Sequence, residues 1–185
     1  MTYELVDPSI WFRPGRVTLY RITPADSTFL PDEPFNSDAG RFSDGKRWVL
    51  YVSANPEGAV AEMLRHNPEL ISFQAELRFR VFEIEITADS DSLDVRTAGQ
   101  SAKVPFPFDR LTSSERDPAE RYKECRDLAD DANDSGGIAY PCAAHVSQSI
   151  WNMALFGEMD ERWTSSGYVE VERPIVDPGD IRFVA

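Results

Sequence analysis

The chain has 185 residues, of which 42% are hydrophobic and 28% are charged. These proportions are typical of one folded domain, here residues 1–185, and they exclude a disordered tail or a fibrous repeat. Acidic residues outnumber basic residues by 32 to 19, which gives a formal net charge of −13. Because proteins bind nucleic acids largely through the phosphates, neither DNA nor RNA is an expected partner.

The sequence carries no signal for a membrane or for secretion. No apolar run approaches the roughly 20 residues that span a bilayer, and the first residues lack the basic and apolar segments of a secretory signal. We therefore expect a cytoplasmic protein that contacts no membrane. The two cysteines, Cys125 and Cys142, do not form the dense pattern of a disulfide scaffold, so both are expected to be reduced.

Two strands separated by a long loop are predicted in the first fifty residues. Residues 17–22 alternate between apolar and polar side chains, as a strand does. Residues 24–47 contain three prolines and two glycines without any periodicity, which predicts an irregular loop. Residues 47–53 are rich in Trp, Val, Leu and Tyr and predict the second strand.

A helix is predicted directly after this strand. Asn55 is a good N-cap, and the following Pro-Glu pair suits the first helical turn. Pro68 disfavours helical geometry in the residue before it, so the helix is expected over residues 56–67. Its buried stripe is expected to contain Val60, Met63 and Leu64.

Strands and helices also mix in the rest of the chain. A strand is expected over 73–86, with a bulge near Val81 and Phe82 where the apolar alternation changes phase. A second helix is expected from Asp117 to the glycines at 136–137. Its predicted buried residues are Ala119, Tyr122, Cys125, either Leu128 or Ala129, and Ala132. The remaining predictions are a strand over 138–141, a short helix over 147–156, and closing strands over 167–171 and 181–184. This order without regular βαβ alternation indicates an α+β fold.

Common catalytic motifs are absent from the sequence. It has no G-x-G-x-x-G motif for dinucleotides and no Walker A motif for nucleoside triphosphates. It also has no C-x-x-C, no H-E-x-x-H and no G-x-S-x-G. With two histidines in the whole chain, we expect no metal site. Four polar residues remain as candidates, although each alone is better explained as an ordinary surface or core residue: Arg21, Arg41, Tyr51 and Glu62.

The context of these four residues resembles the RES domain, the toxin of Xre-RES toxin–antitoxin pairs. The resemblance covers about residues 17–156 and is carried by the segments Leu19-Tyr20-Arg21-Ile22, Ala39-Gly40-Arg41-Phe42-Ser43, Val49-Leu50-Tyr51-Val52-Ser53, Pro56-Glu57-Gly58-Ala59-Val60-Ala61-Glu62, Gly137-Ile138-Ala139-Tyr140-Pro141 and Asn152-Met153-Ala154-Leu155-Phe156. It implies an ADP-ribosyltransferase-like fold of mixed sheets with a few flanking helices. It also implies that NAD⁺ is degraded as a substrate, so no cofactor is expected.

The resemblance places the family's functional residues on the four candidates. Arg21 and Arg41 can bind a diphosphate through paired guanidinium hydrogen bonds. Tyr51 can stack on the cationic nicotinamide ring. Glu62 can stabilise the positive charge that develops on the ribose as the glycosidic bond breaks. Glu62, Arg21 and Tyr51 are thus the expected catalytic residues, and Arg21, Arg41, Tyr51 and Cys142 the expected substrate-binding residues.

The segment Pro141-Cys142-Ala143-Ala144 departs from the family's usual Pro-Ser-Ala-Arg. A cysteine replaces the serine, and a nearby cation is lost. Arg47 or Arg110 could supply the missing cation. Cys142 could act as a nucleophile with His145, but a buried and unreactive thiol is the favoured interpretation.

The resulting hypothesis is an NAD⁺ glycohydrolase or phosphorylase that acts as the toxin of a toxin–antitoxin pair. The alternatives are a mono-ADP-ribosyltransferase that modifies a protein, and a non-catalytic NAD-binding module of the same fold. The resemblance also implies a cognate, Xre-like antitoxin as partner. A homodimer is left open.

Overall fold

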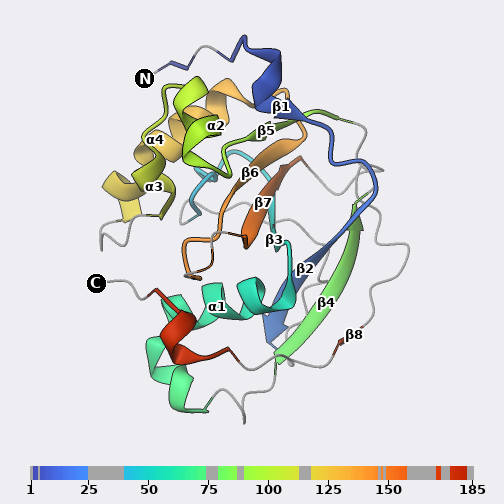
Figure 1. Cartoon of the computed structure of the whole chain (residues 1–185), viewed down its shortest axis with the longest axis vertical. Coiled ribbons are helices and arrows are strands. Elements are labelled where there is room, and N and C mark those ends of the chain that lie inside the picture. Colours follow the sequence, from blue (N-terminus) through green and yellow to red (C-terminus); the bar gives the residue numbers. More distant parts are fainter. Residues whose placement is uncertain are drawn as a thin grey trace.

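The structure is a computed structural model in which one mixed sheet of eight strands organises the chain (Figure 1). It describes residues 2–3, 5–24, 40–73, 79–86, 90–112, 118–145, 147, 149–157, 170–171 and 176–182. The strands are β1 Trp11–Phe12, β2 Val17–Pro24, β3 Val49–Ser53, β4 Phe79–Ile86, β5 Ser92–Asp94, β6 Gly137–Pro141, β7 Trp151–Phe156 and β8 Glu170–Val171. The α-helices are α1 Pro56–His66, α2 Ala98–Lys103, α3 Phe108–Thr112 and α4 Pro118–Asp131. Short 3₁₀ helices cover Pro8–Ile10, Pro68–Phe73 and Pro178–Asp180.

The strand order is β1-β5-β6-β7-β3-β2-β4-β8. Only β5 and β6 pair in parallel among the described strands, and every other pair is antiparallel. Figure 1 shows α1 beside β2 and β3, whereas α2, α3 and α4 gather near β5 and β6. This mixture of a largely antiparallel sheet with a few helices confirms the predicted α+β class.

The sheet is buried on both faces in its centre. On one face Leu50, Met153 and Leu155 join an apolar cluster with residues of β2 and β4. On the other face Val49 and Ala154 pack in the cluster that contains α4. α1 forms a third cluster over the β2–β4 end of the sheet. The pocket that contains the candidate residues lies on the helix-covered face.

The helix α1 begins and ends as the sequence predicts. The Asn55 side-chain oxygen accepts a hydrogen bond from the Gly58 amide at 2.8 Å, which is the expected N-cap contact. The Asn67 amide closes the last turn on the carbonyl of Leu64. Val60 and Leu64 are fully buried, while Met63 is partly buried.

The predicted strand over residues 73–86 is correct only from Phe79 onward. Phe73 ends a 3₁₀ helix and is 55% exposed, and residues 74–78 lie outside the described part of the chain. The predicted bulge is wrong, because the β2–β4 register runs without interruption across all eight paired positions. Val81 and Phe82 are both buried because β4 is covered on both faces, so the apolar phase change needs no bulge.

The predicted helix over residues 147–156 is also wrong. Residues 151–156 form β7, which pairs with β3 on one side and β6 on the other. Five of its six residues are buried. A central strand with two covered faces loses the alternation of polar and apolar residues, so its pattern resembles that of a short buried helix.

The second predicted helix is confirmed as α4, with its expected cap Asp117 outside the described residues. All the predicted buried residues that the structure describes are buried: Tyr122, Cys125, Leu128, Ala129 and Ala132. The helix ends at Asp131, before the predicted glycines.

The remaining predictions have mixed outcomes. The strand over 138–141 is confirmed as β6. Of the closing strands, the described residues form β8 and a bridge between His145 and Ile181, while residues 167–169 and 183–184 lie outside the described part of the chain. The predicted loop is described only from Gly40, where the chain is irregular up to β3. No helix in the described part of the chain combines the length and apolar character needed to cross a bilayer.

Candidate active site

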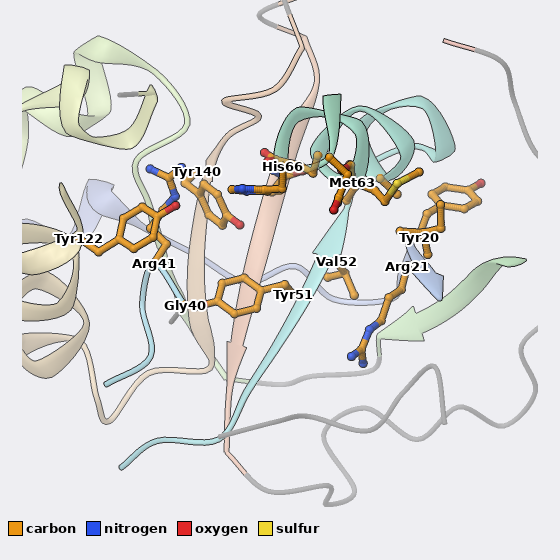
Figure 2. Close-up of a pocket in the computed structure, with 16 residues that line it drawn as sticks. Tyr20, Arg21, Gly40, Arg41, Tyr51, Val52, Met63, His66, Tyr122 and Tyr140 are labelled. Atoms are coloured by element: carbon orange, nitrogen blue, oxygen red, sulfur yellow. Dashed lines mark hydrogen bonds between the residues drawn. The ribbon is translucent and has the colours of Figure 1, made fainter. Parts of the chain in front are cut away.

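A pocket of about 480 Å³ lies between α1 and the sheet, next to α4 (Figure 2). This volume is in the range of small-molecule sites, roughly 300–1,000 Å³. Its lining residues come from β2, β3, α1, α4, β6, β7 and the segment before β3: Tyr20, Arg21, Ile22, Gly40, Arg41, Tyr51, Val52, Ser53, Ala59, Glu62, Met63, His66, Asn67, Tyr122, Tyr140 and Asn152.

A row of polar side chains crosses four strands beneath this pocket. Tyr20 on β2 pairs with Ser53 on β3, Ser53 pairs with Asn152 on β7, and Asn152 pairs with Tyr140 on β6. Directly paired residues point to the same face of a sheet, so these four side chains share the face that α1 covers. We call them the floor row. It brings together residues that are up to 132 positions apart (20 to 152).

Glu62 projects from α1 toward the floor row. Its Oε1 accepts a hydrogen bond from Asn152 Nδ2 at 2.9 Å and a weaker one from Cys142 Sγ at 3.6 Å. The side chain is partly buried and lines the pocket. One carboxylate is therefore held over the sheet by two donors from β7 and the end of β6.

Arg41 places a buried guanidinium at the other side of the pocket. Its Nη1 donates to the carbonyl oxygens of Arg110 and Leu111, at 3.1 and 2.7 Å. The guanidinium carbon also lies 5.0 Å from the Tyr122 ring centre and 5.8 Å from that of Tyr140, which permits cation–π attraction. No carboxylate of the described residues forms an ion pair with Arg41. The cation is thus held by neutral groups.

Tyr51 lies in the wall of the same pocket, beside Gly40 (Figure 2). Its hydroxyl oxygen accepts a hydrogen bond from the Phe42 amide at 2.9 Å. Burial raises the pKa of this phenol, so it stays neutral at physiological pH. Gly40 leaves the necessary room, because a Cβ there would come 2.7 Å from the Tyr51 hydroxyl.

Arg21 lines the same pocket but is oriented differently. It pairs with Phe82 on β4, whereas its neighbour Tyr20 belongs to the floor row. Adjacent strand residues point to opposite faces, so the Arg21 side chain leaves β2 on the side away from α1. Figure 2 shows its side chain running away from α1, with Arg41 at the far side of the pocket. The structure therefore brings Arg41, Tyr51 and Glu62 together and places Arg21 at the margin.

Cys142 lies behind Glu62 and is 3% exposed. Burial, together with the Glu62 charge, raises the pKa of its thiol to about 12. His145 Nδ1 accepts from the Ser147 amide. A protonated thiol that donates to a carboxylate agrees with the favoured interpretation of an unreactive cysteine, and both cysteines are free.

Neither of the two arginines suggested as replacements for the family's missing cation lines the pocket. Arg47 binds Asp130, Asn133 and the Phe42 carbonyl in a second hollow. Arg110 forms an ion pair with Glu124. Both proposals therefore lack support in this arrangement.

Several pocket residues were not predicted from the sequence. Tyr140 is a buried phenol whose pKa is well above its usual value because of burial and the nearby Glu62 charge. Asn152, Tyr122 and His66 also line the pocket. Tyr140 and Asn152 do lie inside the segments Gly137–Pro141 and Asn152–Phe156 that carry the family resemblance, and this is the signal that could have indicated them. Tyr122 and His66 have no such signal.

The fold and the pocket define an α+β protein with a guanidinium, a phenol and a carboxylate around one cavity. Within the described residues no group of three His, Cys, Asp or Glu side chains is arranged to hold a metal ion. The RES domain model matches residues 18–170, and the chain belongs to this family.

Among solved structures, one chain of the M. tuberculosis MbcT–MbcA toxin–antitoxin complex is similar in fold. The TM-score is 0.61 at 15% sequence identity, and the alignment covers 88% of each chain. No curated protein matches the sequence.

Proposed function

We propose that this protein degrades NAD⁺ by cleaving the nicotinamide–ribose bond, with water or phosphate as the acceptor. The observation that carries the proposal is the meeting of Arg41, Tyr51 and Glu62 in one pocket of about 480 Å³. The family resemblance implies functional roles for these residues, and their charges suit the two ends of a dinucleotide. A buried cation faces one part of the cavity and a carboxylate another.

Arg41 is suited to bind the diphosphate of NAD⁺. Its contacts with two main-chain carbonyls and two aromatic rings orient the guanidinium without neutralising it. A buried cation held in this way is stabilised when an anion binds, because the attraction is strong where water is excluded. A guanidinium can also donate two parallel hydrogen bonds to phosphate oxygens.

Glu62 is suited to the bond-breaking step. As the glycosidic bond breaks, its electron pair leaves with nicotinamide, which departs as a neutral molecule, and positive charge develops on the ribose. A carboxylate beside the ribose stabilises this charge. Water or phosphate then attacks the ribose carbon to form ADP-ribose or its phosphate ester. Tyr51, a neutral phenol, can offer its ring for stacking.

We further propose that the protein is the toxin of a toxin–antitoxin pair with a cognate antitoxin. Two findings support this role: the chain belongs to the RES domain family, and its structural neighbour comes from a toxin–antitoxin complex. Loss of NAD⁺ would explain why such an enzyme needs a neutralising partner.

The test is time-resolved product analysis with NAD⁺, in the presence and absence of phosphate. We expect release of nicotinamide together with free ADP-ribose or its phosphate. Label retained on protein would instead indicate ADP-ribosyl transfer. Bound NAD⁺ without nicotinamide release at high protein concentration would indicate a non-catalytic binding module.

Glu62→Gln keeps the size of the side chain and removes its charge. Loss of one electrostatic stabiliser costs roughly 10²–10³-fold in turnover, so we expect a decrease of this order. Glu57→Gln is the matched control, because Glu57 lies in the same helix, is exposed and does not line the pocket. Equal turnover in the two variants would remove Glu62 from the mechanism.

A further inference from the structure

Asn152 makes an unusual contact for a residue in the centre of a sheet. It is 3% exposed, lies on β7, and directs its amide nitrogen at the pocket carboxylate, with 2.9 Å between Asn152 Nδ2 and Glu62 Oε1. We propose that Asn152 is a positioning residue that fixes Glu62 in the orientation needed for cleavage. This inference rests on the proposed function.

The contact determines which way the asparagine amide points. An ionised carboxylate can only accept hydrogen bonds, so the NH₂ group of Asn152 must face Glu62. The carbonyl Oδ1 then points elsewhere, and it is buried without a partner among the described residues. Because a buried polar atom without a partner is costly, the orientation of Asn152 is set by Glu62 and not by its own hydrogen-bonding needs.

The two donors to Glu62 converge on the same oxygen. Asn152 Nδ2 and Cys142 Sγ both donate to Oε1, and Oε2 receives no hydrogen bond from the described residues. This arrangement holds one oxygen and leaves the other for the developing charge on the ribose. Of the two donors the amide is the stronger, because a thiol at 3.6 Å is a weak one.

The position of Asn152 in the sheet makes the contact rigid. The residue is paired on both sides, with Ser53 of β3 and Tyr140 of β6, and so belongs to the centre of the floor row. A donor on a central strand is a more precise support than one on a loop.

Asn152→Asp is the sharpest test, because it replaces the NH₂ donor by an oxygen of nearly the same size. We expect kcat at pH 7 to fall by roughly 10²-fold with KM changed less than about threefold, since a misplaced group loses mainly transition-state stabilisation. The acidic limb of the rate profile should move up by about 1–2 pH units, because two adjacent carboxylates share a proton to higher pH. The shift would show that residue 152 stays against Glu62 in the folded variant.

Asn133→Asp is the matched control: the same substitution at an exposed residue that contacts Arg47, outside the pocket. Asn152→Ala removes the donor without adding a charge and should lower kcat roughly tenfold. Thermal unfolding of each variant establishes that it is folded. If Asn152→Asp does not fold, the kcat of Asn152→Ala decides.

The double variant separates this inference from the proposed function. In a Glu62→Gln background, Asn152→Asp should lower turnover less than about threefold. A residue that acts by positioning the Glu62 carboxylate has no further effect on turnover once that carboxylate is removed. The inference would be overturned if Asn152→Asp had the kcat and the pH profile of the wild type. If Asn152→Asp does not fold, a wild-type kcat in Asn152→Ala would overturn it. In either case an inactive Glu62→Gln would still support the proposed function. Absence of nicotinamide release from the wild-type protein would overturn both.

Discussion

Arg41 shows how a single side chain can be buried while its charge is kept. Its guanidinium is held by two carbonyl oxygens and two tyrosine rings, and Arg41 as a whole is 8% exposed. A lysine has no planar group for this arrangement and cannot bind a diphosphate through paired hydrogen bonds. The chemistry of this site is therefore specific to arginine.

Arg41→Lys should raise the KM for NAD⁺ by about tenfold or more, because charge-assisted bidentate hydrogen bonds are lost. Steady-state kinetics of nicotinamide release measures the effect. Arg13→Lys serves as control, since Arg13 is an exposed arginine that pairs with Asp91 outside the pocket. An unchanged KM in Arg41→Lys would show that the guanidinium does not bind the substrate.

The raised pKa of Cys142 makes a second residue-scale prediction. Since only the thiolate reacts and the pKa is about 12, the reactive fraction at pH 8 is on the order of 10⁻⁴. Iodoacetamide at pH 8 should therefore leave Cys142 unlabelled in the folded protein and label it in urea, as followed by mass spectrometry. Rapid labelling of Cys142 in the folded protein would favour the alternative of a nucleophilic cysteine.

Two glycines in helices offer a comparison at the scale of the element. A Cβ on Gly58 of α1 would come 2.3 Å from Ser53 Oγ and 2.7 Å from Ile150 Cγ2, so this glycine permits close packing of α1 on the sheet. A Cβ on Gly99 of α2 would meet only Thr97 Oγ1, at 3.9 Å. Both glycines lie in helices, and they differ in how much free volume surrounds them.

Gly58→Ala should lower the free energy of unfolding by about 1–3 kcal/mol, because overpacking displaces α1 from the sheet. Gly99→Ala should raise it by roughly 0.5–1 kcal/mol, because alanine is the better helix former. Urea denaturation of both variants measures the two effects. A stabilising Gly58→Ala would contradict the close approach of α1 to β3.

Local signals in the sequence account for the elements that were predicted correctly. The cap at Asn55, the proline at 68 and the alternation in β2 act over a few residues and can be recognised without the fold. The strand β7 could not be recognised in this way, because its second covered face is created by tertiary packing. The short elements β1, β5, α2 and α3 leave too little periodicity to detect.

The same distinction applies to the pocket. Glu62 and Tyr51 were identified because their neighbours resemble a family motif, and both line the cavity. The floor row depends on the pairing of four strands, which no local pattern reveals. Asn152 was therefore assigned to a helix, and its contact with Glu62 could not be predicted.

At the scale of the whole molecule the main feature is the net charge of −13. Such an excess destabilises the compact state through self-repulsion, and salt screens it by reducing the Debye length from about 30 Å at 0.01 M to about 8 Å at 0.15 M. The midpoint of thermal unfolding should therefore rise by a few degrees between these concentrations. Sodium chloride and choline chloride should raise the midpoint equally, because screening depends on ionic strength and not on the identity of the cation. A falling midpoint would show that ion pairs such as Arg47–Asp130 outweigh the repulsion.

The floor row also has a consequence for biosynthesis. Its members stand at positions 20, 53, 140 and 152, and the outer two on the chain are separated by most of the sequence. A ribosome makes the amino-terminal strands first, so the cavity has no complete base until Asn152 has emerged. A nascent or prematurely terminated polypeptide that stops before this residue lacks β7 and the donor to Glu62. The cell that translates the message therefore meets an assembled pocket only after Asn152 of each copy has been made.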